Sequence, residues 1–435
     1  MTEIRRLRSD CADFDQQVRA LQAPMDVLDP GLVTTVRDII ATVREKGDSA
    51  ILEFTKSLDN HPATGMDDLI FDGDRLSQFE AQISDAEREA LDTAATRIRR
   101  YHEQQQAVDW AIEDEYGSRL GQRIQAMSSA GLYVPGGKAS YPSSVLMNAI
   151  PAKVAGVANV TMVAPTPGGE VNPLVMAAAS MAGVDQVVTV GGAQAVAALA
   201  YGTESIAPVD KIVGPGNRFV AEAKRQVFGK VGIDMIAGPS EIFIIADGSV
   251  DPNWIALDLM SQAEHDEVAQ AVCISPNAEH LDAISDAIVA LLPSMPRRSV
   301  IEASLANRGA LIEVDSLESA AQLSNRFAPE HLELAVQNPV ELLANITHAG
   351  AVFLGAYSSE SLGDYCAGSN HVLPTSGAAR FSSPLGVYDF QTRTSIIDVN
   401  ATGAAALAEV AGTLADGESL SAHAAAARAR VNPEG

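Results

Sequence analysis

The chain has 435 residues, 30 of them lysine or arginine and 56 aspartate or glutamate, so its formal net charge is −26. Such an acidic chain repels phosphate backbones and anionic membrane surfaces, which excludes nucleic acid and membranes as expected partners. The start MTEIRRLRSDCADF has no apolar signal-peptide core, and no run of about 20 uncharged apolar residues follows, so we expect a cytoplasmic protein.

The first predicted region, residues 1–128, is mainly helical. Apolar residues recur at helical spacing in VTTVRDIIATVREKGDSAILEFTKSL and again in AEREALDTAATRIRRYHEQQQ. Few residue types in this region point to chemistry.

The pattern changes at GLYVPGG, which begins at Gly131. Short β-rich runs then alternate with Ala-rich helical ones as far as SEIFIIAD, and the alternation repeats from PNWIALDLM to GAVFLG. Continuous apolar strands separated by helices indicate parallel sheets that are covered on both faces. We therefore expect an α/β fold of two doubly wound, Rossmann-like lobes, one over residues 129–240 and one over 241–375.

The last predicted region, residues 376–435, contains the run ATGAAALAEVAGTLADGESLSAHAAAARARV. This run predicts Ala-rich helices that carry few large apolar residues. Because such helices are marginal on their own, we expect the tail to dock on another domain or on another subunit.

Two glycine-containing segments, GGAQAVA from Gly191 and GPGNRFV from Gly214, lie at predicted strand-to-helix junctions. Free amide groups and the helix dipole at such junctions favour an anion, although each glycine could simply form a tight turn. The dinucleotide fingerprint G-x-G-x-x-G is absent from the sequence.

Two further segments carry residues suited to metal binding or proton transfer. In SQAEH, Gln262 and His265 share one face of a predicted helix, either as metal ligands or as part of an exposed polar face. In APEHLEL, Glu330 and His331 follow Pro329, which should end the preceding helix and place both at the mouth of a lobe, near the start of a strand. Carboxylate and imidazole are the usual proton-transfer pair near neutral pH, but Glu-His dipeptides are also common.

Two segments near the C-terminus complete the candidates. GDYCAGSNHVLPT offers Asp364 and His371 in a glycine-containing loop, as an oxygen and an imidazole ligand or, for Asp364, as a loop cap. GESLSAH offers Glu418 and His423, which could equally lie on a solvated helix surface.

Taken together, the segments are far more specific than any one of them. In chain order GLYVPGG, VGGAQAVAA, VGPGN, AGPSE, DLMSQAEHD, APEHLEL, GDYCAGSNHVLPT, ARFSSPLGVYDF and GESLSAH resemble the signature segments of the histidinol dehydrogenase family, from about Gly131 to His423. The resemblance implies incomplete Rossmann lobes of the type shared with aldehyde dehydrogenases, which bind NAD without the usual fingerprint. It also implies a small C-terminal helical domain.

The resemblance also implies a metal site and a subunit arrangement. One zinc ion per active site would be held by Gln262, His265, Asp364 and His423. The family is an intertwined homodimer, so His423 and Glu418 would reach the active site of the partner. The implied reaction oxidises L-histidinol twice, through the aldehyde and its hydrate to L-histidine, and reduces two NAD.

The implied roles of the remaining residues follow from the same match. His331 would be the base that removes the hydroxyl proton, and Glu330 the base that adds water to the aldehyde. The residues implied to contact the substrate are the metal ligands, this pair, Ser240, His371 and Glu418, and those implied to bind NAD are Tyr133, Gln194 and Asn217.

Two rival interpretations remain at the level of sequence. Paralogues with the same zinc and Glu-His residues oxidise other alcohols, including sulfonated diols, but they typically lose the ARFSSPLGVYDF segment, which is present at residues 379–390. The second rival interpretation is a two-lobed solute-binding protein without catalysis. The missing signal peptide and the adjacent Glu330 and His331 count against this interpretation.

Overall fold

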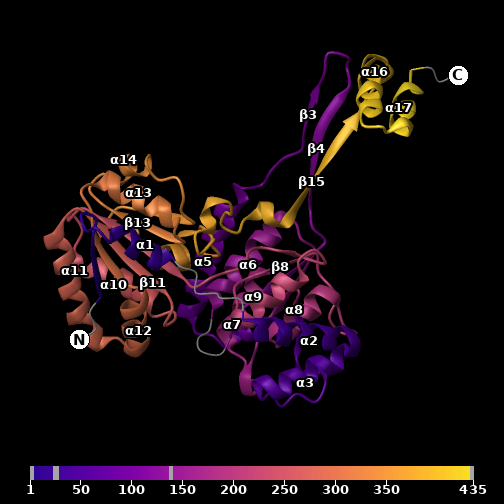
Figure 1. Ribbon diagram of the computed structural model, residues 1–435. Coiled ribbons are helices and arrows are strands. Elements are labelled where there is room, and N and C mark those ends of the chain that lie inside the picture. Colours follow the sequence, from indigo (N-terminus) through magenta and orange to yellow (C-terminus); the bar gives the residue numbers. More distant parts are fainter. Residues whose placement is uncertain (1–3, 23–28, 137–140, 432–435) are drawn as a thin grey trace.

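The computed structural model describes residues 4–22, 29–136 and 141–431. Two α/β lobes lie side by side, and an arm projects away from them (Figure 1). Each lobe is built around one sheet, which has six strands within the described residues.

The first lobe holds a mixed sheet with helices on both faces. In spatial order its strands are β2 (Ile70–Asp72), β7 (Gln186–Val188), β6 (Asn159–Val163), β5 (Ser129–Tyr133), β8 (Lys211–Val213) and β9 (Gly232–Ile233). Only the pairing of β2 with β7 is antiparallel among them. The helices are α2 (Pro30–Lys46), α3 (Asp48–Asp59), α8 (Gly192–Tyr201) and α9 (Arg218–Val227) on one face, and α4 (Gly73–Ser77), α5 (Asp85–Glu103), α6 (Pro142–Ala155) and α7 (Pro173–Ala182) on the other.

The second lobe holds an all-parallel sheet, again covered on both faces. In spatial order its strands are β1 (Arg5–Arg8), β12 (Ala310–Glu313), β11 (Gln270–Ser275), β10 (Glu241–Ala246), β13 (His331–Ala335) and β14 (Ala351–Leu354). The helices are α10 (Pro252–Ala263), α11 (Ala278–Leu291) and α12 (Arg298–Arg308) on one face, and α1 (Phe14–Gln22), α13 (Leu317–Phe327) and α14 (Pro339–Leu343) on the other. Every residue of β10 is buried, which is why it reads as a continuous apolar run. The prediction of two doubly wound α/β lobes is confirmed.

The arm consists of residues 110–126 and 391–428. Its strands β3 (Trp110–Glu113), β4 (Arg119–Ala126) and β15 (Gln391–Asp398) form an antiparallel sheet, and helices α16 (Ala401–Gly417) and α17 (Ser421–Arg428) follow at its outer end (Figure 1). The helical nature of the tail was predicted, whereas β15 was not.

The N-terminal 128 residues contain strands that the helical pattern did not indicate. β1 is an edge strand of the second lobe, and of its four residues RRLR only Leu7 is buried. β2 is an edge strand of the first lobe and has three residues. Short edge strands bury too few residues to show period-two alternation, so neighbouring strands rather than local sequence define them.

Candidate active site

A cavity of about 680 Å³ lies between the lobes and collects most of the predicted site residues. We call it the interlobe cavity. The predicted residues that line it are Asn217, Ser240, Gln262, His265, Glu330, His331, Asp364 and His371. The first lobe contributes through the loop that follows the carboxyl end of β8, the usual ligand-binding edge of a parallel sheet. The second lobe instead contributes from the amino ends of β10 and β13.

The Glu330–His331 pair is placed by a sharp turn between α13 and β13. Helix α13 ends at Phe327, Ala328 adopts the left-handed conformation with φ of 50°, and Pro329 and a bend at Glu330 follow. His331 is then the first residue of β13. The expected position, at the mouth of a lobe near a strand start, is confirmed.

Backbone groups of a single residue, Glu241 on the neighbouring strand β10, hold both members of this pair. Its amide donates to Glu330 Oε2 at 2.8 Å, and its carbonyl oxygen lies 3.0 Å from His331 Nδ1. Because a carbonyl oxygen can only accept, Nδ1 must carry a proton. The other ring nitrogen, Nε2, is 3.4 Å from Asp364 Oδ1.

Buried carboxyl groups surround His331. Glu330 Oε2 and Glu360 Oε1 lie 3.7 Å and 3.8 Å from Nδ1. Burial raises the pKa of both Glu330 and Glu360 to about 8. Burial by itself would lower the pKa of His331, but the carboxylates of Glu360, Glu330 and Asp364 outweigh it and hold that pKa well above its usual range. The site is thus set up for proton transfer near neutral pH.

Three of the four predicted metal ligands border the same cavity. Gln262 lies in the last turn of α10 and is fully buried; His265 is just beyond the helix end, where its amide donates to the Gln262 carbonyl oxygen at 3.2 Å. The expectation that both lie on one helix is wrong for His265, because α10 stops at Ala263, but both residues still line the same cavity. Asp364 lies in the π-helical turn Gly363–Ala367.

The charges and contacts of these residues suit a cation. Burial lowers the pKa of His265, against the opposing charge of Asp364, so a neutral imidazole is favoured. A different group, His331, Glu360 and Asp364, brings its ligand atoms within 4.8 Å of one another, and it shares only Asp364 with the predicted ligand set. Amide oxygen, imidazole and carboxylate are all ligands that zinc accepts. The residues present therefore fit the implied ion.

The Gln262 amide already has neighbours in the protein. In the orientation that satisfies them, its oxygen accepts from the Glu241 amide at 2.9 Å and its nitrogen donates to Glu360 Oε2 at 3.1 Å. Glu241 is thus hydrogen-bonded both to the predicted metal ligand and to the Glu-His pair, while Glu360 is hydrogen-bonded to Gln262 and lies 3.8 Å from His331 Nδ1.

His371 lies between the two lobes. Its Nδ1 is 3.0 Å from the Asp364 carbonyl oxygen and its Nε2 is 3.3 Å from the hydroxyl of Ser144, the third residue of α6. Burial lowers its pKa, so a neutral ring that donates from Nδ1 and accepts from Ser144 matches both contacts. His371 therefore links the second-lobe site to the first lobe.

The three residues predicted to bind NAD follow carboxyl ends of first-lobe strands. Tyr133 ends β5, and its hydroxyl accepts from the Gly192 amide at 3.0 Å. Gln194 lies in the first turn of α8, is 1% exposed, and has a buried Oε1 that finds no hydrogen-bond partner in the described part of the chain. Asn217 caps α9 and borders the interlobe cavity, whereas the described lining of that cavity includes neither Tyr133 nor Gln194.

Glu418 and His423, like Tyr133 and Gln194, are absent from the described lining of the cavity, and they lie far from it in the fold (Figure 1). Both are exposed, Glu418 at the end of α16 and His423 within α17, at the outer end of the projecting arm (Figure 1).

Sequence reasoning missed Glu360, Glu241 and Ser144. Glu360 precedes Asp364 by one helical turn in ESLGD, a spacing that could have identified it. Glu241 acts mainly through its backbone, and Ser144 meets His371 across 227 positions of sequence, so neither leaves a local signal.

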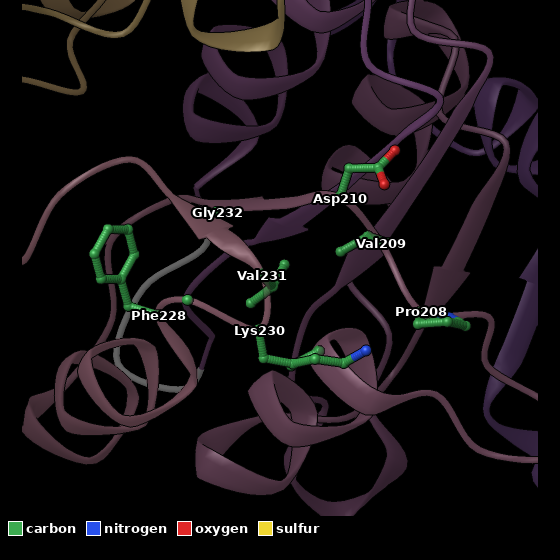
Figure 2. A pocket seen from close by; sticks show the side chains of 9 residues that line it. Pro208, Val209, Asp210, Phe228, Lys230, Val231 and Gly232 are labelled. Atoms are coloured by element: carbon green, nitrogen blue, oxygen red, sulfur yellow. The ribbon is translucent and has the colours of Figure 1, made fainter. Parts of the chain in front are cut away.

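A second hollow, of about 380 Å³, lies at the amino ends of β8 and β9, at the end of these strands away from the interlobe cavity. Figure 2 shows its lining, in which Pro208, Val209 and Asp210 precede β8 and face the segment from Phe228 to Gly232. Its lining residues are mainly apolar or glycine, and only Asp210 and Lys230 among them are charged. It offers none of the acid–base pairing of the interlobe cavity.

Two α/β lobes with a buried glutamate–histidine pair and metal-suited side chains between them define a two-lobed enzyme of acid–base chemistry. The histidinol dehydrogenase family model matches residues 27–431. The chain is 58% identical over 431 residues to the histidinol dehydrogenase of Pseudomonas aeruginosa, covering 99% of this chain and 98% of that protein. It is 57% identical over 426 residues to that of Chromobacterium violaceum, covering 98% of each.

A solved structure agrees with these sequence relatives. The crystal structure of histidinol dehydrogenase from Elizabethkingia anophelis superposes with a TM-score of 0.93 at 32% identity, covering 99% of this chain and 98% of that one. The chain belongs to the histidinol dehydrogenase family, which is a family of oxidoreductases.

Proposed function

We propose that the protein oxidises L-histidinol to L-histidine, the last step of histidine biosynthesis, in two NAD-linked steps at a zinc site. The observation that carries the proposal is the interlobe cavity, in which the buried Glu330–His331 pair stands beside Gln262, His265 and Asp364. Family membership supplies the substrate, and this arrangement supplies groups for each proton transfer that the two oxidations need.

His331 acts as the base that takes the hydroxyl proton in each oxidation. With Nδ1 donating to the Glu241 carbonyl oxygen, the lone pair of a neutral ring is on Nε2, beside Asp364. Glu330, held by the Glu241 amide, acts as the base that activates water for addition to the aldehyde. Each role needs the deprotonated form of its residue, although burial or neighbouring charges raise the pKa of both His331 and Glu330. A cation bound nearby would lower both pKa values.

Gln262, His265 and Asp364 would hold the zinc ion, together with the partner subunit's His423. When bound, the ion supplies a fixed positive charge that orients the nitrogen atoms of the substrate. NAD, which accepts the hydride, would lie toward the first lobe near Tyr133, Gln194 and Asn217. Ser240 and His371 line the cavity in positions suited to contact the substrate.

The projecting arm supports a homodimer in which His423 and Glu418 are exchanged between subunits. All four residues of β3 are exposed, as are most of β15. Large apolar side chains stand in solvent along the arm, among them Trp110, Ile112, Ile397, Val410 and Leu414. Apolar exposure on this scale indicates a covering partner.

The net charge of −26 is consistent with a small-molecule enzyme that binds neither nucleic acid nor membranes.

Across residues 4–22, 29–136 and 141–431, every helix is too short or too polar to cross a membrane. A cytoplasmic location stays a prediction from the sequence.

The test is the amount of NADH formed per L-histidinol consumed, with and without prior chelation. We expect about two NADH per substrate, loss of activity on chelation and recovery with zinc. Absence of NAD reduction with L-histidinol, but activity with another alcohol, would assign the protein to a paralogous reaction.

A further inference from the structure

A buried ion pair lies beside the interlobe cavity and takes no part in the proposed chemistry. Lys224 of α9 donates to Asp234, which follows β9, and both side chains are only 2% exposed. Removing two charges from water is costly, so such a pair persists where further hydrogen bonds satisfy its atoms. Those further bonds show what the pair holds.

Both side chains converge on Gly214, the first residue after β8. Lys224 Nζ donates to the Gly214 carbonyl oxygen at 2.9 Å, and Asp234 Oδ2 accepts from the Gly214 amide at 2.7 Å. Gly214 has φ of 108°, and a Cβ there would lie 2.1 Å from the Tyr133 carbonyl oxygen. Only glycine suits this conformation. Because glycine has no side chain, other residues must hold the backbone at Gly214 in place.

The segment that begins at Gly214 borders the interlobe cavity as far as Asn217. It packs on the start of α9, because Asn217 Oδ1 accepts from the Phe219 amide at 3.0 Å and a Cβ at Gly216 would lie 2.4 Å from Val220. Lys224 projects from this same helix. Ion pair, helix and segment therefore form one unit whose free side faces the proposed NAD site.

Asp234 also fixes the start of the connection between the lobes. Its Oδ1 accepts from the Met235 amide at 2.6 Å, and the chain then runs through Gly238, whose amide donates to Thr375 at 2.6 Å, to Ser240 at the substrate side. The same carboxylate thus contacts the cofactor-side segment and the path that leads to the substrate-side residues.

We propose that the Lys224–Asp234 ion pair is a positioning device for the cofactor, which holds residues 214–217 in the conformation that binds NAD. The inference rests on the proposed function, which places Asn217 on NAD. Preorganisation of a binding segment raises affinity by removing the cost of ordering it. The pair lies outside the acid–base residues, so its loss should weaken NAD binding and leave the chemical step nearly unchanged.

The experiment compares zinc-loaded wild-type dimer with Lys224→Gln, Asp234→Asn and the double variant. The KM for NAD and the Kd for NADH, measured by fluorescence, should rise about tenfold or more. This is the lower end of the loss in affinity seen when residues that orient the binding groups are replaced. The kcat at saturating NAD and the KM for L-histidinol should each change by less than about twofold.

A second ion pair of the same lobe, with side chains 20% and 48% exposed, serves as a control. Lys153 Nζ lies 2.7 Å from Asp185, whose carboxylate also accepts from the Val160 amide at 2.7 Å, but these residues are outside the described lining of the cavity. The Lys153→Gln/Asp185→Asn variant should keep the wild-type KM for NAD, even where its melting temperature falls.

An unchanged KM for NAD in the Lys224 and Asp234 variants overturns the inference, as does an equal loss in kcat and in both KM values. If circular dichroism shows that a single variant is unfolded, the double variant decides, because it removes both charges and leaves no unpaired buried charge. A wild-type dimer that fails to reduce NAD with L-histidinol refutes the proposed function instead, so the two failures are distinct.

Discussion

His331 has its two ring nitrogens in different surroundings, and that asymmetry defines its chemistry. Nδ1 is committed to a carbonyl oxygen at 3.0 Å, while Nε2 faces Asp364 and the cavity. A neutral ring so oriented can accept a proton only at Nε2. The peptide groups of Glu241 thus determine which atom of His331 would be the base under the proposed function, and they also fix the carboxyl group of Glu330.

His331→Asn tests the assigned base. The Asn side chain can still donate to the Glu241 carbonyl oxygen but cannot take a proton, so we expect turnover to fall by at least about a hundredfold. Zinc content, measured by atomic absorption, should be unchanged. Near-normal turnover in this variant would remove His331 from the proposed role.

Glu330→Gln tests the division of labour within the pair. Gln keeps an acceptor for the Glu241 amide but loses the base that activates water. We expect the second oxidation to slow more than the first, so that NADH per L-histidinol in short assays falls from about two toward one, the yield of the first step alone. Equal slowing of both steps, seen in single-turnover traces, would contradict the separate role of Glu330.

Strand β13 places a further ionisable side chain deep inside the second lobe. Two residues beyond His331, Glu333 is 4% exposed, and its Oε1 accepts from the Glu360 amide at 2.8 Å. Burial, together with the nearby carboxyl groups of Asp258 and Glu360, holds the pKa of Glu333 well above its usual range. The raised pKa favours the neutral acid, and the hydrogen bond to the Glu360 amide anchors the short helix α15 (Glu360–Leu362) at the site.

Two substitutions at Glu333 separate its hydrogen bond from its charge. Glu333→Leu leaves the Glu360 amide unpaired and should lower the free energy of unfolding by about 1–3 kcal/mol, whereas Glu333→Gln keeps the acceptor. Because the folded pKa is above the unfolded one, the stability that Glu333 contributes is present at low pH and is lost as pH rises from about 4.5 through the folded pKa. Urea unfolding from pH 5 to 9 should show a shallower loss in Glu333→Gln than in wild type. The same slope in both would contradict the raised pKa.

The elements predicted from the sequence are those with strong periodicity. β10, β11 and the helices between the strands of both lobes appear as continuous apolar or amphipathic runs, because their environment is buried on defined faces. The end of α10 could not be located, since DLMSQAEHDE continues a helical pattern past Ala263. β15 was missed because QTRTSIID is exposed over seven of its eight residues and depends on pairing with β4.

The site was predictable in its residue types but not in its assembly. The order of the motifs identified Glu330, His331, Gln262, His265 and Asp364, and the structure brings all five to one cavity. The contributions of Glu241 and Ser144 arise from strand register and from contact between lobes, which a single sequence does not encode locally.

At the scale of the whole molecule, the arm separates part of the predicted site from the rest. His423 lies in α17, and the described lining of the interlobe cavity does not include it. Large apolar residues of α16 and β4, among them Val410 and Leu120, are 57% and 37% exposed instead of being buried in a core of the arm. An arm with so little burial in its own subunit is suited to closing the site of a second copy.

Heterodimers provide a direct test of that exchange. Co-expression of His331→Asn and His423→Asn chains with different tags yields dimers in which one site combines both defects and the other, if the arms are exchanged, combines none. Such a heterodimer should have about half the wild-type activity, while each homodimer is nearly inactive. As a control, the His331→Asn chain paired with Glu330→Gln should stay inactive, because both defects lie in the core of a subunit and each site contains one. An inactive heterodimer of the first kind, with both tags present and zinc bound, would place His423 and the rest of its site in the same chain.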